Sequence, residues 1–266
     1  MAQSTQLTKT LTPIQVAFLL SLDEREMDIF SLGELEKELG SQYSNLSELT
    51  ENLAHKKLLL RIERGKYCRA NFQDELVIGC HLVADGLVSY WSALNYHGLT
   101  DQFPNTIFIQ TTHRKEEKSV FGVRYRFIRI PETKRGGIKI EGRGSRRFSI
   151  TDLEKTIVDC FDLPQYSGGY EELIRAFFQA QVDVQKLISY CVQSDNKAII
   201  RRMGAIAEIS SKKGMDEFIS YAQSQVNESK SLFDPLGAAK GSYSTKWKLR
   251  MNITSEDIQK ICGGTI

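Results

Sequence analysis

Leucines recur every three or four positions over residues 32–39 and again over 46–53, which is the spacing of helices that bury one face. Ser31 and Glu34 have the spacing of a capping box, so the first of these helices should begin directly after Ser31. Gly40 is a residue type that commonly ends a helix. The pattern therefore predicts two amphipathic helices joined by a short turn.

Two strand-like runs follow at 58–62 and 67–70, joined by a turn at 63–66 that contains a glycine. Such a turn between two apolar runs is typical of a β-hairpin. An earlier helix is expected to start at Pro13, with Thr12 as its cap. Helix, turn, helix and hairpin in this order are typical of a winged helix-turn-helix, so residues 1–75 are expected to form a DNA-binding domain.

The outward face of the second helix is polar, and its hydroxyl, amide and imidazole groups could hydrogen-bond to base edges or phosphates. Cations at the end of this helix and in the hairpin could contact the DNA backbone. We therefore predict a DNA-binding set of Ser44, Asn45, Ser47, Asn52, His55, Lys56, Lys57, Arg61, Arg64 and Lys66. Asn45, Ser47 and Asn52 are the expected readers of base sequence.

Charge distribution favours DNA over a protein partner for this domain. The whole chain has a net charge of +2, and residues 1–75 hold nine basic and twelve acidic side chains. The acids, however, concentrate in 23–28 and 34–38, whereas residues 55–69 hold six basic side chains and a single acid. Winged helices also serve as docking modules, but a local excess of cations is what a polyanion requires.

Residues 76–266 are expected to form a larger mixed α+β domain with a small sheet and C-terminal helices. A helix over 84–97 should be followed by strands at 106–110, 120–130, 138–141 and 147–150. The chain then reads as mostly helical from 151 to about 226, with a strand-like segment at 243–252 before a last short helix. The fold class expected for the whole chain is α+β.

Residues 113–148 form a second basic region, with twelve basic and four acidic side chains. Alternation along 123–129 places the arginines mostly on one side of a strand. This region is either a solvated strand face or a further contact with flanking DNA or with RNA. The residues of this second basic patch are Arg124, Arg126, Arg129, Arg143, Arg146 and Arg147.

The helix after residue 150 holds the densest group of ionisable side chains. Thr151 and Glu154 have capping-box spacing, and Lys155 lies four residues before Asp159, with which it could pair. Stabilisation of the helix accounts for all of these residues. The alternative is that Asp152, Lys155 and Asp159 mark an exposed working face.

Several segments, in this order, resemble the AbiEi antitoxins, the repressor half of an abortive-infection toxin–antitoxin pair. Besides the N-terminal winged helix they are Ser89-Tyr90-Trp91-Ser92-Ala93-Leu94-Asn95-Tyr96-His97-Gly98-Leu99-Thr100, Asp152-x-Glu154-Lys155-Thr156-x-x-Asp159, Leu163-Pro164-Gln165-Tyr166-Ser167-Gly168-Gly169, Arg202-Met203-Gly204-Ala205-Ile206-Ala207-Glu208 and Trp247-Lys248-Leu249-Arg250-Met251-Asn252. The resemblance implies autorepression through the winged helix. It also implies that the second domain counters a nucleotidyltransferase-like toxin without forming a stable complex, as in type IV antagonism. Asp152, Lys155 and Asp159 then become the candidate antitoxin face.

Enzyme chemistry finds little support in the residue pattern. The fragment Glu132-x-Lys134 occurs in metal-dependent nucleases, but such sites need two or three converging carboxylates. The four histidines lie far apart and outside recognisable metal-ligand spacings, so neither a metal nor a cofactor is expected. The five scattered cysteines form no C-x-x-C pair, which argues against a zinc site or a disulfide framework.

These patterns describe a cytoplasmic regulator that binds an operator, as two copies on an inverted repeat in its own promoter. The cysteine usage and the lack of a signal-like or membrane-spanning apolar run underlie the cytoplasmic expectation. Two alternatives remain open. In one, the second domain of a one-component regulator senses a small ligand. In the other, the antitoxin acts by protein or RNA contact and the winged helix is vestigial.

Overall fold

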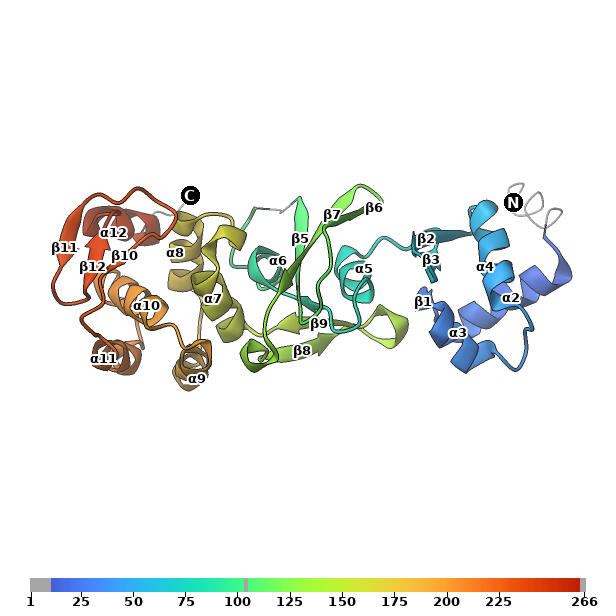
Figure 1. Cartoon of the computed structure of the whole chain (residues 1–266), viewed down its shortest axis with the longest axis horizontal. Coiled ribbons are helices and arrows are strands. Elements are labelled where there is room, and N and C mark those ends of the chain that lie inside the picture. The colour runs from blue at the N-terminus through green and yellow to red at the C-terminus, as the bar shows by residue number, and fades with distance from the viewer. Residues whose placement is uncertain (1–10, 103–104, 264–266) are drawn as a thin grey trace. The chain divides into compact units, whose positions relative to one another are not determined.

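The computed structural model describes residues 11–102 and 105–263, and these form a mixed α+β fold, as expected (Figure 1). The chain divides into two compact units. The first consists of Met1–Gly86 and Ile140–Phe148, and the second consists of Leu87–Lys139 and Ser149–Ile266. The boundary expected after residue 75 therefore falls inside the first unit. This unit also includes the later segment Ile140–Phe148.

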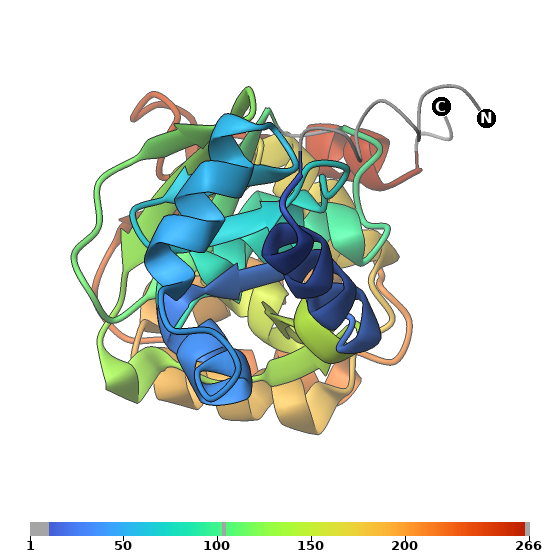
Figure 2. The same cartoon turned by 90° about the vertical axis from the view of Figure 1, so that its right-hand side faces the viewer.

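Up to residue 69, the described part of the first unit has three helices around a small antiparallel sheet of order β1-β3-β2 (Figures 1 and 2). Thr12 and Gln15 close a capping box on the first helix, and Ser31 and Glu34 close one on the second, as the sequence predicts. The elements are α2 (Pro13–Glu24), β1 (Ile29–Ser31), α3 (Leu32–Leu39), α4 (Leu46–His55), β2 (Leu59–Glu63) and β3 (Lys66–Arg69). The leucines of α3 and α4 pack with Phe18 and Tyr67 in one core.

Two further segments complete the first unit. Helix α5 (Glu75–His81) begins at Asp74, whose carboxylate accepts hydrogen bonds from two backbone amides of the first turn. The sequence pattern does not predict this helix. The segment 140–148 returns to β1, because the Ser145 hydroxyl accepts a hydrogen bond from the Asp28 amide at 2.9 Å and donates one to the Glu26 carbonyl at 2.6 Å.

A six-stranded mixed sheet of order β6-β7-β5-β4-β9-β8 lies mainly in the second unit, and only the end of β8 and the start of β9 fall in the first. Strands β5 and β7 run parallel over six residue pairs, and β6 and β7 form a hairpin around Phe121 and Gly122. The expected single strand over 120–130 is therefore two strands. The strands are β4 (Leu87–Val88), β5 (Thr106–Thr111), β6 (Lys118–Val120), β7 (Val123–Arg129), β8 (Ile138–Glu141) and β9 (Phe148–Thr151).

Helices make up most of the remainder, as expected from residue 151 onward. The helix expected over 84–97 is shorter, because Leu87 and Val88 pair with β5 and β9 instead of starting a helix. The helices are α6 (Tyr90–Tyr96), α7 (Leu153–Asp162), α8 (Tyr170–Gln179), α9 (Val184–Ser194), α10 (Lys197–Ile209), α11 (Asp216–Ser224) and α12 (Ser255–Gly263). No helix among the described residues is long and apolar enough to cross a membrane.

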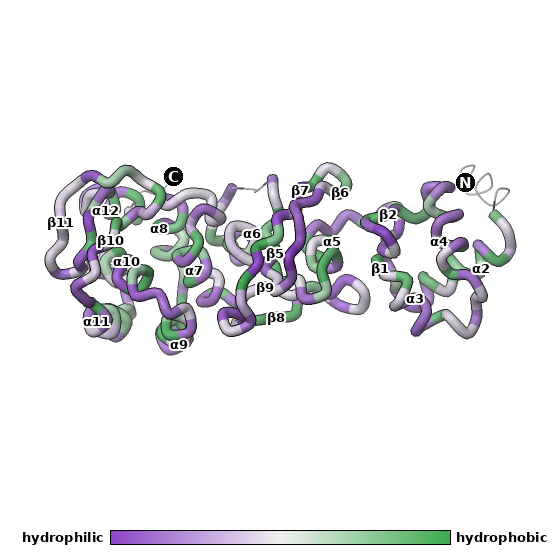
Figure 3. The backbone as a smooth tube through the Cα atoms, viewed as in Figure 1, coloured by the Kyte–Doolittle hydropathy of each residue, from purple (hydrophilic) through white to green (hydrophobic). Residues whose placement is uncertain are grey.

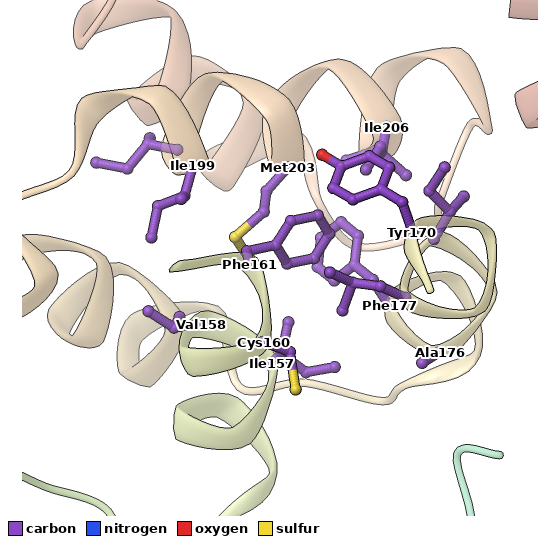
Figure 4. Packing of buried hydrophobic residues seen from close by; sticks show 14 of the residues in the cluster. Ile157, Val158, Cys160, Phe161, Tyr170, Ala176, Phe177, Ile199, Met203 and Ile206 are labelled. Carbon is purple, nitrogen blue, oxygen red and sulfur yellow. The ribbon is translucent and has the colours of Figure 1, made fainter. Parts of the chain in front are cut away.

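The core of the second unit lies between α7, α8 and α10 (Figure 4). Phe161 of α7 meets Tyr170 and Phe177 of α8 edge-on, with ring centroids 6.1 and 5.6 Å apart. Met203 and Ile206 of α10 close the other side of this cluster. Edge-to-face aromatic pairs add about 0.5–1.5 kcal/mol each beyond area burial, so this cluster fixes the position of α7.

Candidate nucleic-acid interface

Helix α4 places its polar residues outward, as predicted. Leu46, Leu49 and Leu53 are buried, whereas Ser47 and Asn52 are exposed on the opposite side. Ser44 and His55 are also exposed, at the two ends of the helix. At about 1.5 Å per residue, these ends lie roughly 15 Å apart. The exposed side of α4 is thus long enough to follow several base pairs of a groove.

The middle of this face is acidic. Glu48, Glu51 and His55 follow one another at intervals of three and four residues within α4, so they form a single stripe along the helix. Both glutamates are exposed. Carboxylates repel phosphate but can accept a hydrogen bond from the amino group of cytosine. Plotting the residues at 100° intervals would have revealed this stripe from the sequence.

Asn45 is committed to capping α4. Its Oδ1 accepts a hydrogen bond from the Glu48 amide at 3.1 Å, and its Nδ2 donates to the Glu48 carboxylate at 2.8 Å. Both polar ends of the Asn45 side chain are therefore occupied in this structure. Ser47 and Asn52 remain the better placed of the three expected readers.

The cations that follow α4 divide into bound and free groups. The Lys56 ammonium donates to the Gln15 Oε1 at 2.7 Å and so ties the end of α4 to the start of α2. Lys57 is exposed in the left-handed backbone region with φ of 59°, and no side-chain partner is found for it among the described residues. Only Lys57 of this pair has an ammonium free to meet a phosphate.

The predicted hairpin is present, formed by β2 and β3 with a turn at Arg64 and Gly65. Gly65 has φ of 71°, and its carbonyl accepts a hydrogen bond from the Leu32 amide at 2.8 Å, which fixes the turn against the start of α3. Arg61 and Arg64 are exposed, and neither has a partner within the described part of the chain. These two guanidinium groups can reach a polyanion.

Lys66 is directed into the first unit. Its ammonium donates to the Leu82 carbonyl at 2.9 Å and lies 3.5 Å from the Glu63 carboxylate. Lys66 belongs to the predicted DNA-binding set, but its ammonium is engaged within the first unit in this structure. Arg69, which adds to the local positive charge, forms an ion pair with Asp23. The free cations near α4 and the hairpin are therefore Lys57, Arg61 and Arg64.

Three arginines of the second basic patch lie on β7, which is largely hydrophilic (Figure 3). Arg124 lies 3.3 Å from the Glu117 carboxylate, and the Arg126 guanidinium lies 5.0 Å from the centre of the Tyr166 ring. Arg129 donates to the Thr112 carbonyl at 3.1 Å. Arg129 is three residues after Arg126 in a regular strand, so it belongs to the opposite face of the sheet. Only Arg124 and Arg126 share a side.

The other three arginines of the patch belong to the first unit. Arg146 lies 2.5 Å from the Asp28 carboxylate and 5.9 Å from the centre of the Phe72 ring. The hydrogen bond to Asp28 raises the pKa of Arg146. Arg146 thus ties the segment 140–148 to Asp28 beside β1, although its side chain is exposed, as are those of Arg143 and Arg147.

The candidate antitoxin face is buried. Asp152, Lys155 and Asp159 are 5%, 3% and 8% exposed, so the alternative of an exposed working face is wrong. The expected pair of Lys155 and Asp159 forms. The cap of α7 is Asp152, whose carboxylate accepts from the Lys155 amide at 2.9 Å, and not the predicted Thr151. This stripe of α7 faces other elements of the second unit instead of solvent.

Those elements supply polar partners. Gln110 of β5 donates to Asp159 at 2.7 Å, and the Tyr190 hydroxyl of α9 donates to Asp152 at 2.9 Å. Burial raises the pKa of Asp159, and the Lys155 ammonium opposes that rise. A buried carboxylate needs such a counter-charge and such hydrogen bonds to remain ionised. The network therefore joins α7 to the sheet and to α9, which is a structural role.

Metal chemistry has no assembled site in the described part of the chain, where no group of three or more His, Cys, Asp or Glu side chains could hold an ion. The two residues of the nuclease-like fragment, Glu132 and Lys134, have other charged neighbours. Lys134 donates to the Asp162 carboxylate at 2.8 Å, and Glu132 lies 4.0 Å from Arg135.

Comparison with solved structures shows a protein with a similar fold. No protein-family model matches the sequence, and no curated protein matches it either. Among solved structures, the chain is similar to the RV2827C protein from Mycobacterium tuberculosis, with a TM-score of 0.63 and 14% sequence identity over 90% of this chain and 92% of that chain. The two chains share a fold over nearly their whole length. The AbiEi resemblance remains a prediction from the sequence motifs.

Proposed function

We propose that this chain is a DNA-binding autorepressor and the antitoxin of an AbiE-like toxin–antitoxin phage-defence system. In this proposal the first unit is a winged helix-turn-helix, α4 is its recognition helix and the β2–β3 hairpin is its wing. The observation that carries the DNA-binding part is the group of free cations, Lys57, Arg61 and Arg64, next to an exposed polar helix.

The arrangement of elements supports this assignment. Helix, strand, two helices and a hairpin follow one another, and β1 pairs with β3 at the edge of the three-stranded sheet. In helix-turn-helix proteins the second helix of the motif enters the major groove and its N-terminal residues contact base edges. Ser47 lies in the first turn of α4, Ser44 lies just before the N-cap Asn45, and Asn52 lies five residues after Ser47.

The acidic stripe of α4 gives the proposal a specific consequence. Glu48 and Glu51 would disfavour non-specific approach to phosphates, so affinity would come from Lys57 and the hairpin arginines at the edges of the helix. Glu51 would accept a hydrogen bond from a cytosine amino group. Binding should then be modest on random DNA and stronger where a cytosine faces α4.

The antitoxin part rests on the ordered motifs of the second unit and on the family they resemble. A nucleotidyltransferase-like toxin encoded beside this chain would be its functional target, with no stable complex between the two proteins. Repression and antitoxicity would then belong to different units of the chain.

A two-part genetic experiment tests the proposal. A promoter–reporter fusion to the upstream DNA should be repressed by the wild-type chain and released by the double variant Arg61→Ala/Arg64→Ala. The same double variant should still rescue growth when the neighbouring toxin gene is induced. If the double variant represses the reporter as strongly as the wild-type chain does, the proposed DNA-binding role is wrong. If the wild-type chain does not rescue growth, the proposed antitoxin role is wrong.

A further inference from the structure

A second small sheet, near the C-terminus, exposes an aromatic ring among basic side chains. It has the order β10-β12-β11, formed by β10 (Ser231–Leu232), β11 (Ser242–Ser244) and β12 (Leu249–Met251), and lies beside α12 (Figure 1). Leu249 and Met251 are buried and Arg250 is exposed, so Arg250 points outward. Tyr243 is the cross-strand partner of Arg250 and is 39% exposed. Both side chains therefore share the outer face.

Cations dominate the surroundings of this ring. Residues 229–250 contain five basic side chains and one acidic side chain. The Lys230 ammonium lies 5.4 Å from the centre of the Tyr243 ring, and Lys240 is exposed in the loop before β11. Lys230, Lys240 and Arg250 have no carboxylate partner among the residues the structure describes, whereas Lys246 and Lys248 pair with Glu208 and Glu228.

Two buried arginines beneath the sheet add to this positive field. Arg201 and Arg202 are 1% and 8% exposed and lie on α10. Arg201 donates to the Ser229 carbonyl at 2.5 Å and to the Ser231 hydroxyl at 3.0 Å, and Arg202 donates to the Leu232 carbonyl at 3.0 Å. Within 11–102 and 105–263, neither guanidinium has a carboxylate partner. Their N–H groups therefore donate to neutral oxygen acceptors, and no carboxylate of the described residues neutralises their positive charge.

We propose that Lys230, Lys240, Tyr243 and Arg250, which we call the C-terminal basic face, bind a single-stranded polynucleotide. An exposed aromatic ring among cations is the combination that stacks an unpaired base while the cations contact the adjoining phosphates. A duplex would offer the phosphates but not the base, because its bases are already stacked on one another. This proposal concerns the second unit and is independent of duplex binding by the first.

The buried arginines explain why the surface is suited to this task. They donate to the carbonyl and hydroxyl oxygens of Ser229, Ser231 and Leu232, so the segment on both sides of Lys230 has a fixed position. An uncompensated positive charge under a surface attracts anions, and the attraction weakens as salt screens it. Arg250 donates to the Ala239 carbonyl at 3.3 Å, a neutral acceptor that leaves its charge uncancelled. Three cations without a carboxylate partner among the described residues should give a salt slope of up to about 2, at roughly 0.7 per phosphate contact on a single strand.

Fluorescence anisotropy of the full-length protein with labelled oligouridine and oligothymidine tests the proposal. Tyr243→Ala should weaken binding of both about tenfold, and Tyr243→Phe should not, since stacking needs the ring and not its hydroxyl. Lys230→Gln/Arg250→Gln should lower the salt slope. Tyr96→Ala is the matched control, because Tyr96 is also an exposed tyrosine, at 42%, outside this face.

Each result bears on the proposal. Equal binding of the two oligonucleotides identifies phosphate and base as the shared determinants, and a preference for oligouridine adds recognition of the ribose hydroxyl. The proposal is overturned if the wild-type protein binds neither oligonucleotide, or if Tyr243→Ala binds as well as Tyr96→Ala. Displacement of the oligonucleotide by polyglutamate at equal charge would also overturn it and point to an acidic protein partner.

Discussion

At the residue scale, the Lys155–Asp159 pair shows how a motif that suggests a site can instead hold a core together. Removing the lysine as Lys155→Met leaves Asp159 with its charge buried and only the Gln110 amide as a partner. Such a loss is expected to cost about 3–5 kcal/mol at neutral pH. Lys186→Met is the matched control, because Lys186 is exposed and lies 4.0 Å from Asp152. Its cost should stay below about 1 kcal/mol, and chemical denaturation measures both values.

The pH dependence of that cost follows from the pKa of Asp159. Burial raises this pKa, so the folded protein binds the proton more tightly than the unfolded chain and stability falls as pH rises through it. Lys155 limits the rise, and its removal should push the pKa higher. The destabilisation by Lys155→Met should therefore be small near pH 4, about where an ordinary Asp titrates, and should grow toward neutral pH. A destabilisation that does not change with pH would contradict this account of the network.

The hairpin offers a contrast between two neighbouring cations. Arg64 is exposed and free, whereas Lys66 is bound to the Leu82 carbonyl. Arg64→Ala should weaken DNA binding about equally on all sequences and lower the salt slope by up to about 0.9. Lys66→Ala should leave the slope unchanged and instead lower the stability of the first unit by about 1 kcal/mol. The reverse pattern would show that Lys66 leaves its internal partners to bind DNA.

At the element scale, the turn before β8 depends on a glycine. Gly137 has φ of 60°, and a Cβ there would lie 2.6 Å from the Lys155 Cβ and 2.8 Å from the Asp152 carboxylate. Gly137→Ala should therefore cost about 2–4 kcal/mol, from backbone strain together with overpacking. Gly214→Ala is the control, because Gly214 has φ of 74° and open space around it. It should cost only about 1 kcal/mol, and equal costs at both positions would show that the α7 contact does not matter.

The elements that the sequence predicts well are those with local signals. The helices that begin at Pro13, Leu32 and Leu46 carry caps, and the last two also carry regular leucine stripes; each begins where expected. The hairpin was equally clear because its turn contains Gly65. Periodicity and capping depend on a few neighbouring residues, so they can be recognised in the sequence without knowledge of the rest of the fold.

The errors arose where tertiary contacts decide the outcome. Leu87 and Val88 look like the first turn of a helix, but partners in β5 and β9 draw them into the sheet. The charged stripe of α7 resembles an exposed face, because nothing in the sequence indicates that Gln110 and Tyr190 cover it. Likewise, the local excess of cations in 55–69 includes Lys56, Lys66 and Arg69, whose partners lie far away in sequence.

At the scale of the whole molecule, the motifs that suggest a family relationship prove to be contacts within the second unit. Gly168 lies against the Trp91 ring, and the Trp247 indole nitrogen donates to the Glu208 carboxylate at 2.9 Å. His97 is within 2.8 Å of the Thr151 carbonyl. These motif residues therefore contribute to the fold of the second unit.

The chain crosses between its two units three times, at residues 86–87, 139–140 and 148–149. The segment 140–148 is held to β1 by Ser145 and Arg146, so the first unit includes residues distant from it in sequence. We expect a fragment that ends at residue 75 to lose these contacts. Duplex binding should therefore be tested on the full chain.

The central claim is that the first unit binds DNA, and one titration tests it most directly. Fluorescence anisotropy of the full-length protein should be measured on its own upstream duplex and on a scrambled duplex, at two salt concentrations. The account predicts tighter binding to the upstream duplex, with an affinity that falls as salt rises. Equal binding to both duplexes, or none to either, would contradict it and leave α4 and the hairpin as a surface for a protein partner.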